Sequence, residues 1–287
     1  MKNSFPFILP DFFKNKKIQS YESITGGDIN KAWQITTEDQ IYFLKENNQP
    51  PAEDFLEIEK HGLKILEETK TIKIPKTFEA GNQDGTAYLI MEYLSPVLPE
   101  KAGWKNLGRQ LAALHQITQD QFGLDHANFI GSLPQTNHQH SYWSEFYVLE
   151  RLIPQIKMAR DQQLLDAQDL KGLEKLYKEI PNICPDEPPA LTHGDLWSGN
   201  FLIINDQIPV LIDPAVSYAH REMDLAMTQL FGGFDSIFYD IYQSDFPLAP
   251  GFSNRSEIYQ LYYLLVHLNL FGRGYLSRVR AAVHLYI

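Results

Sequence analysis

Hydrophobic and polar positions alternate along the first part of the chain in the way that is typical of β-strands. Residues 18–46 contain three such stretches, separated by short polar turns, and 74–94 contain two more. Between them, apolar residues in 53–68 recur every three or four positions, which predicts a helix. Because short turns join neighbouring strands, we expect a small five-stranded antiparallel lobe with one helix, ending near residue 94.

The pattern becomes helical after Ser95 and Pro96. Helices are predicted over 104–114, 142–156, 170–180 and 258–271. Pro154 is expected to kink or end the second of these, since proline lacks the backbone N–H. We therefore predict a bilobal α+β fold, with residues 1–94 as an ATP-binding lobe and 95–287 as a larger, mostly helical lobe for catalysis and substrate.

The stretch HGDLWSGN (193–200) carries the strongest chemical signal. Asp195 lies in a loop and Asn200 follows five positions later, directly before the apolar run FLII (201–204). Asp213 ends a second apolar run, in PVLIDP. A carboxylate that holds an attacking hydroxyl, with two oxygen ligands for Mg²⁺, is the set that phosphoryl transfer needs. The kinase pattern H-R-D, then Asn, then D-F-G has this order, with Gly194 here in place of Arg and DPA in place of DFG. Each residue alone is more often a turn residue, but the three together predict a catalytic loop.

Lys45 and Glu59 form the second candidate pair. Glu59 lies on the apolar face of its helix, four positions from both Phe55 and Leu63. An inward carboxylate needs a partner, and Lys45 at the end of the third strand is the nearest cation in sequence. This pair would direct the lysine ammonium at the nucleotide phosphates, as in kinases. Another surface cation remains a possible partner for Glu59.

Two more segments are predicted to border ATP. Gly26 and Gly27 could let a turn close over the phosphates, although a glycine pair in a hairpin is usually only a turn. Met91, at the end of the fifth strand, would form a wall of the adenine pocket, or would equally suit an ordinary buried strand. Backbone groups at the adenine edge are expected from Glu92, Tyr93 and Leu94.

Several other polar residues are expected to be structural. His115 lies beside an apolar stripe, and Asp224 is predicted to anchor the catalytic loop by hydrogen bonds. The aromatics of FGGF (231–234) are expected in the core, with a sugar site as the alternative. Residues 122–140 hold three histidines, but their spacing does not favour a metal site.

The composition of the chain limits the kinds of partner and location that fit the protein. The chain has 25 Lys plus Arg against 36 Asp plus Glu, a net charge of −11, which argues against nucleic acid or an anionic membrane. Cys184 is the only cysteine, so an internal disulfide and a zinc–cysteine cluster are excluded and a cytoplasmic location fits. No apolar run reaches the length of a membrane span, and the amino terminus does not resemble a signal peptide.

At this point the sequence resembles the fructosamine kinase (ketosamine-3-kinase) family, in the aminoglycoside phosphotransferase and choline kinase branch of the protein kinase-like fold. The resemblance runs over nearly the whole chain. The matching motifs are GGDIN (26–30), YFLK (42–45), EIEKHGL (57–63), FIGSLPQ (129–135), THGDLWSGN (192–200), DPAVSYAHREMDLAM (213–227) and HLNLFGRGYL (267–276).

The resemblance implies ATP-dependent phosphorylation of the 3-hydroxyl of a ketoamine, which is a sugar adduct on an amine or on a protein lysine. The product would then shed the sugar, so the reaction would deglycate. Asp195 would orient or deprotonate the hydroxyl, Asn200 and Asp213 would hold Mg²⁺, and Lys45 with Glu59 would position ATP. Trp197 would border the ketoamine, although simple packing also explains it.

Two positions depart from the family pattern. Asp28 follows Gly27 where some members have a cysteine, so redox control there is not expected, and Arg273 stands between Gly272 and Gly274 where a third glycine is expected.

The alternatives are a kinase of an aminoglycoside or choline-like cation, which acidic residues on the substrate side would favour, and a nucleotide-binding pseudokinase. The preferred sugar and the oligomeric state stay open.

Overall fold

The computed structural model describes residues 8–24, 30–48 and 54–287. Five strands form one antiparallel sheet in the order β1-β2-β3-β5-β4, as predicted. They are β1 (Ile18–Ile24), β2 (Lys31–Thr37), β3 (Ile41–Asn47), β4 (Thr77–Gln83) and β5 (Thr86–Glu92). Gly26 and Gly27, predicted to border the phosphates, lie outside the described residues, so that prediction stays open.

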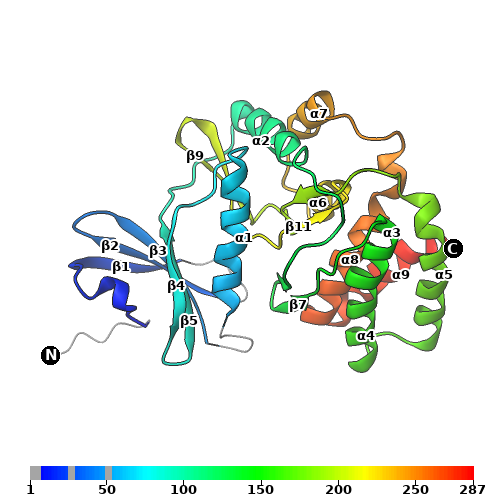
Figure 1. The fold of residues 1–287 in the computed structure, drawn as a ribbon, viewed down its shortest axis with the longest axis horizontal. Coiled ribbons are helices and arrows are strands. Elements are labelled where there is room, and N and C mark those ends of the chain that lie inside the picture. The colour runs from blue at the N-terminus through cyan, green and yellow to red at the C-terminus, as the bar shows by residue number, and fades with distance from the viewer. Residues whose placement is uncertain (1–7, 25–29, 49–53) are drawn as a thin grey trace.

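Helix α1 (Phe55–Thr69) crosses beside β4 and β5, between the sheet and the rest of the molecule (Figure 1). Its apolar face buries Phe55, Leu56, Leu63 and Leu66, which is the periodicity that predicted the helix. It ends where Lys70 adopts a left-handed conformation and donates its backbone N–H to the Glu67 carbonyl. The predicted small lobe of five strands and one helix is therefore confirmed.

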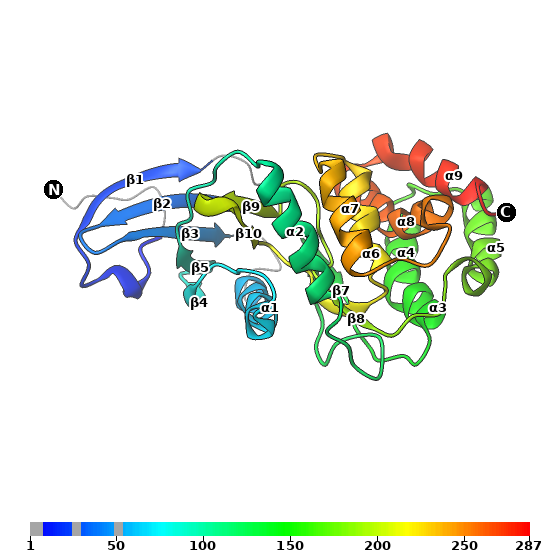
Figure 2. The ribbon, with the colours of Figure 1, turned by 90° about the horizontal axis from the view of Figure 1, so that it is seen from above.

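The remaining chain is mostly helical. Its longer helices are α2 (Lys101–Leu114), α4 (Ile153–Asp161), α5 (Ala167–Ile183), α6 (Glu222–Leu230), α7 (Ser236–Asp245), α8 (Phe252–Phe271) and α9 (Leu276–His284). Helix α8 is buried along most of its length and packs against α4, α6 and α9 (Figures 1 and 2). None of the helices within the described ranges has both the length and the hydrophobicity needed to span a membrane.

Short elements lie before the sheet and between the helices. They are 3₁₀ turns at Asp11–Phe13, Asn205–Gln207 and Arg273–Tyr275, and the strands β6 (Asn128–Ile130), β7 (Leu133–Gln135), β8 (Ala190–Thr192), β9 (Phe201–Ile204), β10 (Ile208–Leu211) and β11 (Ser217–Ala219). The pairs β6–β7, β8–β11 and β9–β10 are each antiparallel. Two of these pairs matter for the site, because the catalytic loop leaves β8 and enters β9.

Pro154 does not end its helix. The run starts as α3 (Trp143–Phe146), continues as a π-helical turn (Tyr147–Leu152), and becomes α4 with Pro154 in its first turn. Proline removes one N–H donor and crowds the carbonyl four residues earlier. The wider π-helical turn directly before it accommodates both effects, so the expected irregularity precedes the proline instead of breaking the helix.

Buried side chains form three clusters, and one of them joins the two parts of the molecule. Residues of α1 and β5 share this cluster with residues of α2, β8, β9 and α7, including Leu63, Met91, Leu107, Leu191 and Phe238. A second cluster lies within the helical part, and the third covers the opposite face of the sheet. The sheet is thus fixed to the helical part by shared apolar packing.

Candidate active site

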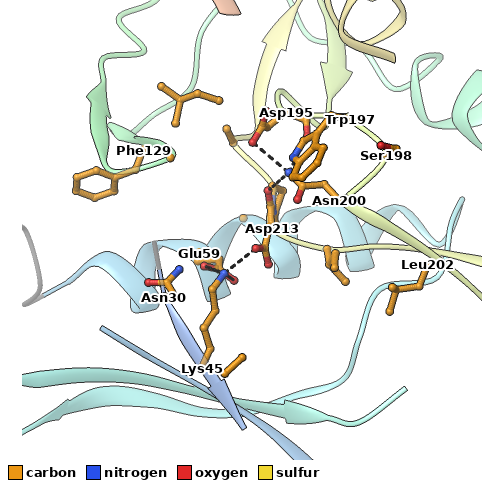
Figure 3. A pocket seen from close by; sticks show the side chains of 18 of the residues that line it. Asn30, Lys45, Glu59, Phe129, Asp195, Trp197, Ser198, Asn200, Leu202 and Asp213 are labelled. Atoms are coloured by element: carbon orange, nitrogen blue, oxygen red, sulfur yellow. Dashed lines mark hydrogen bonds and ion pairs between the residues drawn. The ribbon is translucent and has the colours of Figure 1, made fainter. Parts of the chain in front are cut away.

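A cavity of about 850 Å³ lies between the sheet and the helical part. It collects every predicted site residue that the structure describes: Lys45, Glu59, Met91, Glu92, Tyr93, Leu94, Asp195, Trp197, Asn200 and Asp213. Figure 3 shows Lys45 rising from the sheet toward Glu59 and Asp213, with Asp195, Asn200 and Trp197 on the opposite side. Residues far apart in sequence therefore meet in one place, as the motif order predicted.

The catalytic loop needs glycine at position 194. Gly194 has φ +84°, and a Cβ there would lie 2.0 Å from the carbonyl oxygen of Ala215. At the same place the Ala215 N–H donates to the His193 carbonyl at 2.9 Å, so a hydrogen bond joins the loop to the DPA segment (213–215). A larger residue, such as the Arg of the H-R-D pattern, would clash here, so Gly194 is what allows the loop to pack on the DPA segment.

Asp224 anchors this loop, as the sequence predicted. Its buried carboxylate accepts the backbone N–H of His193 at 2.7 Å and that of Gly194 at 2.8 Å. It also accepts a hydrogen bond from His115 Nε2 at 3.1 Å, and His115 Nδ1 lies 2.7 Å from the Tyr242 hydroxyl. Burial raises the pKa of Asp224. These hydrogen bonds and the nearby histidines lower it by more, so the net pKa lies below its ordinary value. His115 is structural, as expected.

Asp195 and Asn200 face each other across the loop. The Asn200 amide nitrogen donates to the Asp195 carbonyl at 2.8 Å and to its carboxylate Oδ2 at 3.0 Å. This use of the nitrogen leaves the amide oxygen of Asn200, a residue that lines the cavity, as an acceptor to which none of the described residues donates. Burial and the charge of Asp213 raise the pKa of the Asp195 carboxyl, the hydrogen bond from Asn200 opposes the rise, and the net pKa is about 7.

Lys45 lies between two carboxylates. Its ammonium is 2.8 Å from Glu59 Oε2 and 2.9 Å from Asp213 Oδ2, so the predicted pair forms and Asp213 joins it. Burial lowers the pKa of Lys45, but the charges of Asp213 and Glu59 outweigh that effect and hold the pKa above its ordinary value. The lysine is therefore a fixed positive charge in the cavity.

Helix α1 is held in place from the catalytic side. A Cβ at Gly62 would lie 3.4 Å from Pro214 Cγ and 3.4 Å from Val216 Cγ2, so the helix backbone runs directly against the segment after Asp213. At the start of the helix, the rings of Phe55 and Phe129 have centroids 4.9 Å apart. These contacts fix the position of Glu59, and with it that of Lys45.

The edge of the cavity next to β5 is formed by Met91, Glu92, Tyr93 and Leu94. The Glu92 carboxylate accepts the backbone N–H of Lys76 at 2.9 Å and the ammonium of Lys73 at 3.3 Å, so it is not free for a ligand. The Tyr93 N–H donates to the Ile41 carbonyl at 3.3 Å. Met91 is buried beside this edge and lines the cavity, in keeping with its predicted place.

The far side of the cavity was only partly foreseen. Phe234 packs on Trp104 and Phe201, as a core residue of FGGF would. Phe231 differs: it is 39% exposed and lines the cavity, so placing it in the core is wrong. His267 lines the cavity as well, and sequence reasoning missed this role. Its signal was a histidine that interrupts an otherwise apolar helix.

The three histidines of 122–140 have other partners. His138 Nδ1 and His140 Nε2 lie 3.1 Å from the two carboxylate oxygens of Glu150, and His126 pairs with Asp125 at 2.6 Å. The two contacts with Glu150 tie the loop to the π-helical turn. None of these histidines is among the described residues that line the cavity, where Asn200 and Asp213 carry oxygen atoms of the kind that can hold a metal ion.

Comparison with known proteins gives the family. The family described as fructosamine kinase matches residues 6–287. The chain belongs to the fructosamine kinase family. A "probable ketoamine kinase" of Enterococcus faecium is 41% identical over 280 residues, which cover 95% of this chain and 96% of the relative. The chloroplastic protein-ribulosamine 3-kinase of Arabidopsis thaliana is 37% identical, covering 96% and 84%.

Solved structures confirm the fold. A crystal structure assigned as a fructosamine-3-kinase, from Thermobifida fusca, has a TM-score of 0.85 and 31% identity and covers 94% of each chain. The aminoglycoside phosphotransferase APH(4)-Ia, in a ternary complex with AMP-PNP and hygromycin B, has a TM-score of 0.66 at 18% identity, with 96% of each chain covered. This fructosamine kinase family member is thus an ATP-using phosphotransferase with a protein kinase-like fold.

Proposed function

We propose that this kinase phosphorylates the 3-hydroxyl of ketoamines with MgATP. The observation that carries the proposal is the composition of the cavity wall opposite the sheet. Among the described lining residues, the side contributed by α6, the residue that follows it and α8 is apolar and aromatic, and it contains no carboxylate. Its residues include Met227, Phe231, Tyr263, Val266 and His267. A polycationic aminoglycoside would need several carboxylates there, whereas a ketoamine carries one cation.

In this proposal Asp195 receives the acceptor hydroxyl. Its carboxylate is half-buried, held by Asn200, and has a pKa raised to about 7, which suits a group that takes a proton from an alcohol. Trp197, which lines the same cavity, would border the sugar. The chain's own part is to place the hydroxyl in line with the phosphoryl group, since phosphoryl transfer depends mostly on positioning and electrostatics.

On the nucleotide side, Lys45 would contact the α and β phosphates while Glu59 keeps it in place. The Asn200 amide oxygen and the Asp213 carboxylate are the hard oxygen donors that Mg²⁺ prefers, and both face the cavity, so the residues present fit the ion. Mg²⁺ bound there would neutralise charge on the phosphates. Met91 and the backbone of 92–94 would surround adenine, with the lobes dividing at residues 94 and 95.

The product of 3-phosphorylation would lose its sugar, so the reaction would deglycate its amine. Free ketoamines and glycated protein lysines are both acceptors that this proposal allows. Because ATP is the phosphoryl donor and Cys184 is the only cysteine, we place the reaction in the cytoplasm.

The test is ADP release with MgATP and a panel of acceptors: fructosyl-, ribulosyl- and erythrulosyl-lysine, an aminoglycoside and choline. We expect turnover of the ketoamines only, and its loss in Asp195→Asn. Asp240→Asn, an exposed carboxylate outside the cavity, is the matched control and should retain activity. Turnover confined to the aminoglycoside or to choline would refute the ketoamine assignment but preserve the kinase mechanism. Nucleotide binding without any turnover would indicate a pseudokinase.

A further inference from the structure

Four side chains form an aromatic wall at the far side of the cavity: Phe231, His267, Phe271 and Tyr275. The ring centroid of His267 lies 4.8 Å from that of Phe231, 5.5 Å from Phe271 and 5.1 Å from Tyr275. Phe231 and Phe271 are 39% and 51% exposed. Large aromatic side chains that stay exposed while lining a cavity are suited to contact a ligand.

The aromatic wall begins beside the catalytic loop. The Tyr263 hydroxyl donates to the Gly194 carbonyl at 3.0 Å, which attaches α8 to the residue before Asp195, and His267 follows one helical turn later. The loop after Phe231 is equally close, because a Cβ at Gly233 would lie 2.7 Å from Ser198 Cβ. An acceptor with its hydroxyl at Asp195 would therefore extend toward the aromatic wall.

The hydrogen bonding of His267 fixes its chemical form. Its Nδ1 lies 2.8 Å from the Tyr263 carbonyl, which can only accept, so Nδ1 carries the hydrogen and Nε2 carries a lone pair. No described residue donates to Nε2. His267 is half-buried and lines the cavity, so its ring is open to a ligand there. Burial lowers the pKa of His267, which keeps the imidazole neutral and Nε2 an acceptor.

The carboxylates of the cavity are committed elsewhere. Among the described lining residues they are Glu59, Glu92, Asp195 and Asp213. Glu59 pairs with Lys45, Glu92 with Lys73 and a backbone N–H, and the other two serve catalysis and the metal in the proposed function. The exposed guanidinium of Arg278 lies 6.0 Å from the centroid of Phe231, on a ring of the wall that does not carry the acceptor. A single ammonium at the His267 end of the wall would be met by ring faces and by the His267 acceptor, and Arg278 would oppose a second positive charge there.

We propose that the aromatic wall determines the amine specificity of the kinase. His267 Nε2 accepts a hydrogen bond from the protonated nitrogen of the ketoamine, while the rings cover that nitrogen and the apolar group attached to it. The preferred acceptors are adducts of small apolar or aromatic amines, which have one positive charge and no carboxylate beside it. This inference rests on the proposed ketoamine kinase function.

The experiment compares adducts of one sugar on three amines: benzylamine, the side-chain amine of N-acetyl-lysine, and glycine. Full-length protein with MgATP is assayed for kcat and KM. We expect the lowest KM for the benzylamine adduct and the highest for the glycine adduct. His267→Leu should raise the KM for the benzylamine adduct about tenfold, because a hydrogen bond to a charged group is lost. His267→Gln, which retains an acceptor, should recover most of this loss.

Phe271→Ala should raise the same KM about fivefold through loss of a ring face, and kcat and the KM for ATP should stay within about twofold in all three variants. The matched controls are His284→Gln and Leu149→Ala, an exposed histidine and an exposed leucine outside the cavity, which should match wild type. Equal KM values in wild type and the aromatic-wall variants, or a glycine adduct as good as the benzylamine adduct, would overturn the inference while leaving ketoamine turnover intact. No turnover of any ketoamine would overturn the proposed function and the inference together.

Discussion

Asp224→Asn tests the anchor under the catalytic loop. The buried carboxylate of Asp224 accepts two backbone N–H groups, at 2.7 Å from His193 and 2.8 Å from Gly194. Asparagine offers only one oxygen, so one of these N–H groups would face an NH₂ group instead. Losing one charge-assisted hydrogen bond costs about 1.5–3 kcal/mol, and leaving a buried donor without a partner belongs to the same range. We expect a loss of about 3 kcal/mol in the free energy of unfolding.

Because both donors belong to the loop that carries Asp195, the substitution should also displace the Asp195 carboxylate, which is proposed to be catalytic. A displacement of about 1 Å can lower kcat by about 100-fold. Urea unfolding gives the stability, and ADP release with the best ketoamine gives kcat, with KM for ATP as an internal reference. Asp240→Asn is the matched control on the surface. An unfolding free energy within about 0.5 kcal/mol of wild type, together with an unchanged kcat, would refute the anchoring role.

Three further predictions use the same assays. Lys45→Met should weaken ATP binding about 100-fold, measured by titration with a nucleotide analogue, while Lys64→Met, on the exposed face of α1, should not; equal affinities would contradict the phosphate contact. Gly194→Ala should lower the unfolding free energy by about 3 kcal/mol or more, since its Cβ would lie 2.0 Å from a backbone carbonyl oxygen at φ +84°; a wild-type denaturation midpoint would contradict this. Burial keeps the pKa of His220 below its ordinary 6.5, and its Nδ1 accepts a backbone N–H. The stability that the neutral ring contributes is therefore complete above pH 6.5 and is lost as the pH falls through the folded pKa. His220→Gln should flatten the dependence of the unfolding free energy on pH, and the same dependence in the variant and in wild type would refute this.

The strand and helix pattern of the small lobe, and the residues of the catalytic constellation, follow from local sequence. Alternation predicted the five strands, and the inward position of Glu59 on α1 predicted its pairing with Lys45. Asp195, Asn200 and Asp213 could be predicted because their spacing places them at neighbouring strand ends. Such features depend on residues near one another in the chain, so a single sequence contains them.

Features that depend on tertiary contacts were missed. The second partner of Lys45, Asp213, comes from 168 positions away, and no local pattern marks the approach. Phe231 directly follows α6, and His267 lies on α8 among apolar residues, but both line the cavity instead of packing in a closed core. Periodicity identifies which side of a helix is inward, and does not distinguish a packed interior from the wall of a binding site.

The contact of α1 with the segment after Asp213 has a consequence for control of the enzyme. In kinases that are controlled by a conformational switch, the helix that carries the glutamate must move before the glutamate can pair with the lysine. Here Gly62 lies against Pro214 and Val216, and Phe55 against Phe129, so folding itself assembles the ion pair. The energy for this assembly is supplied once, when the chain folds, and not at each turnover. In this structure α1 already has the position in which Glu59 pairs with Lys45, so this helix does not have to move for the pair to form.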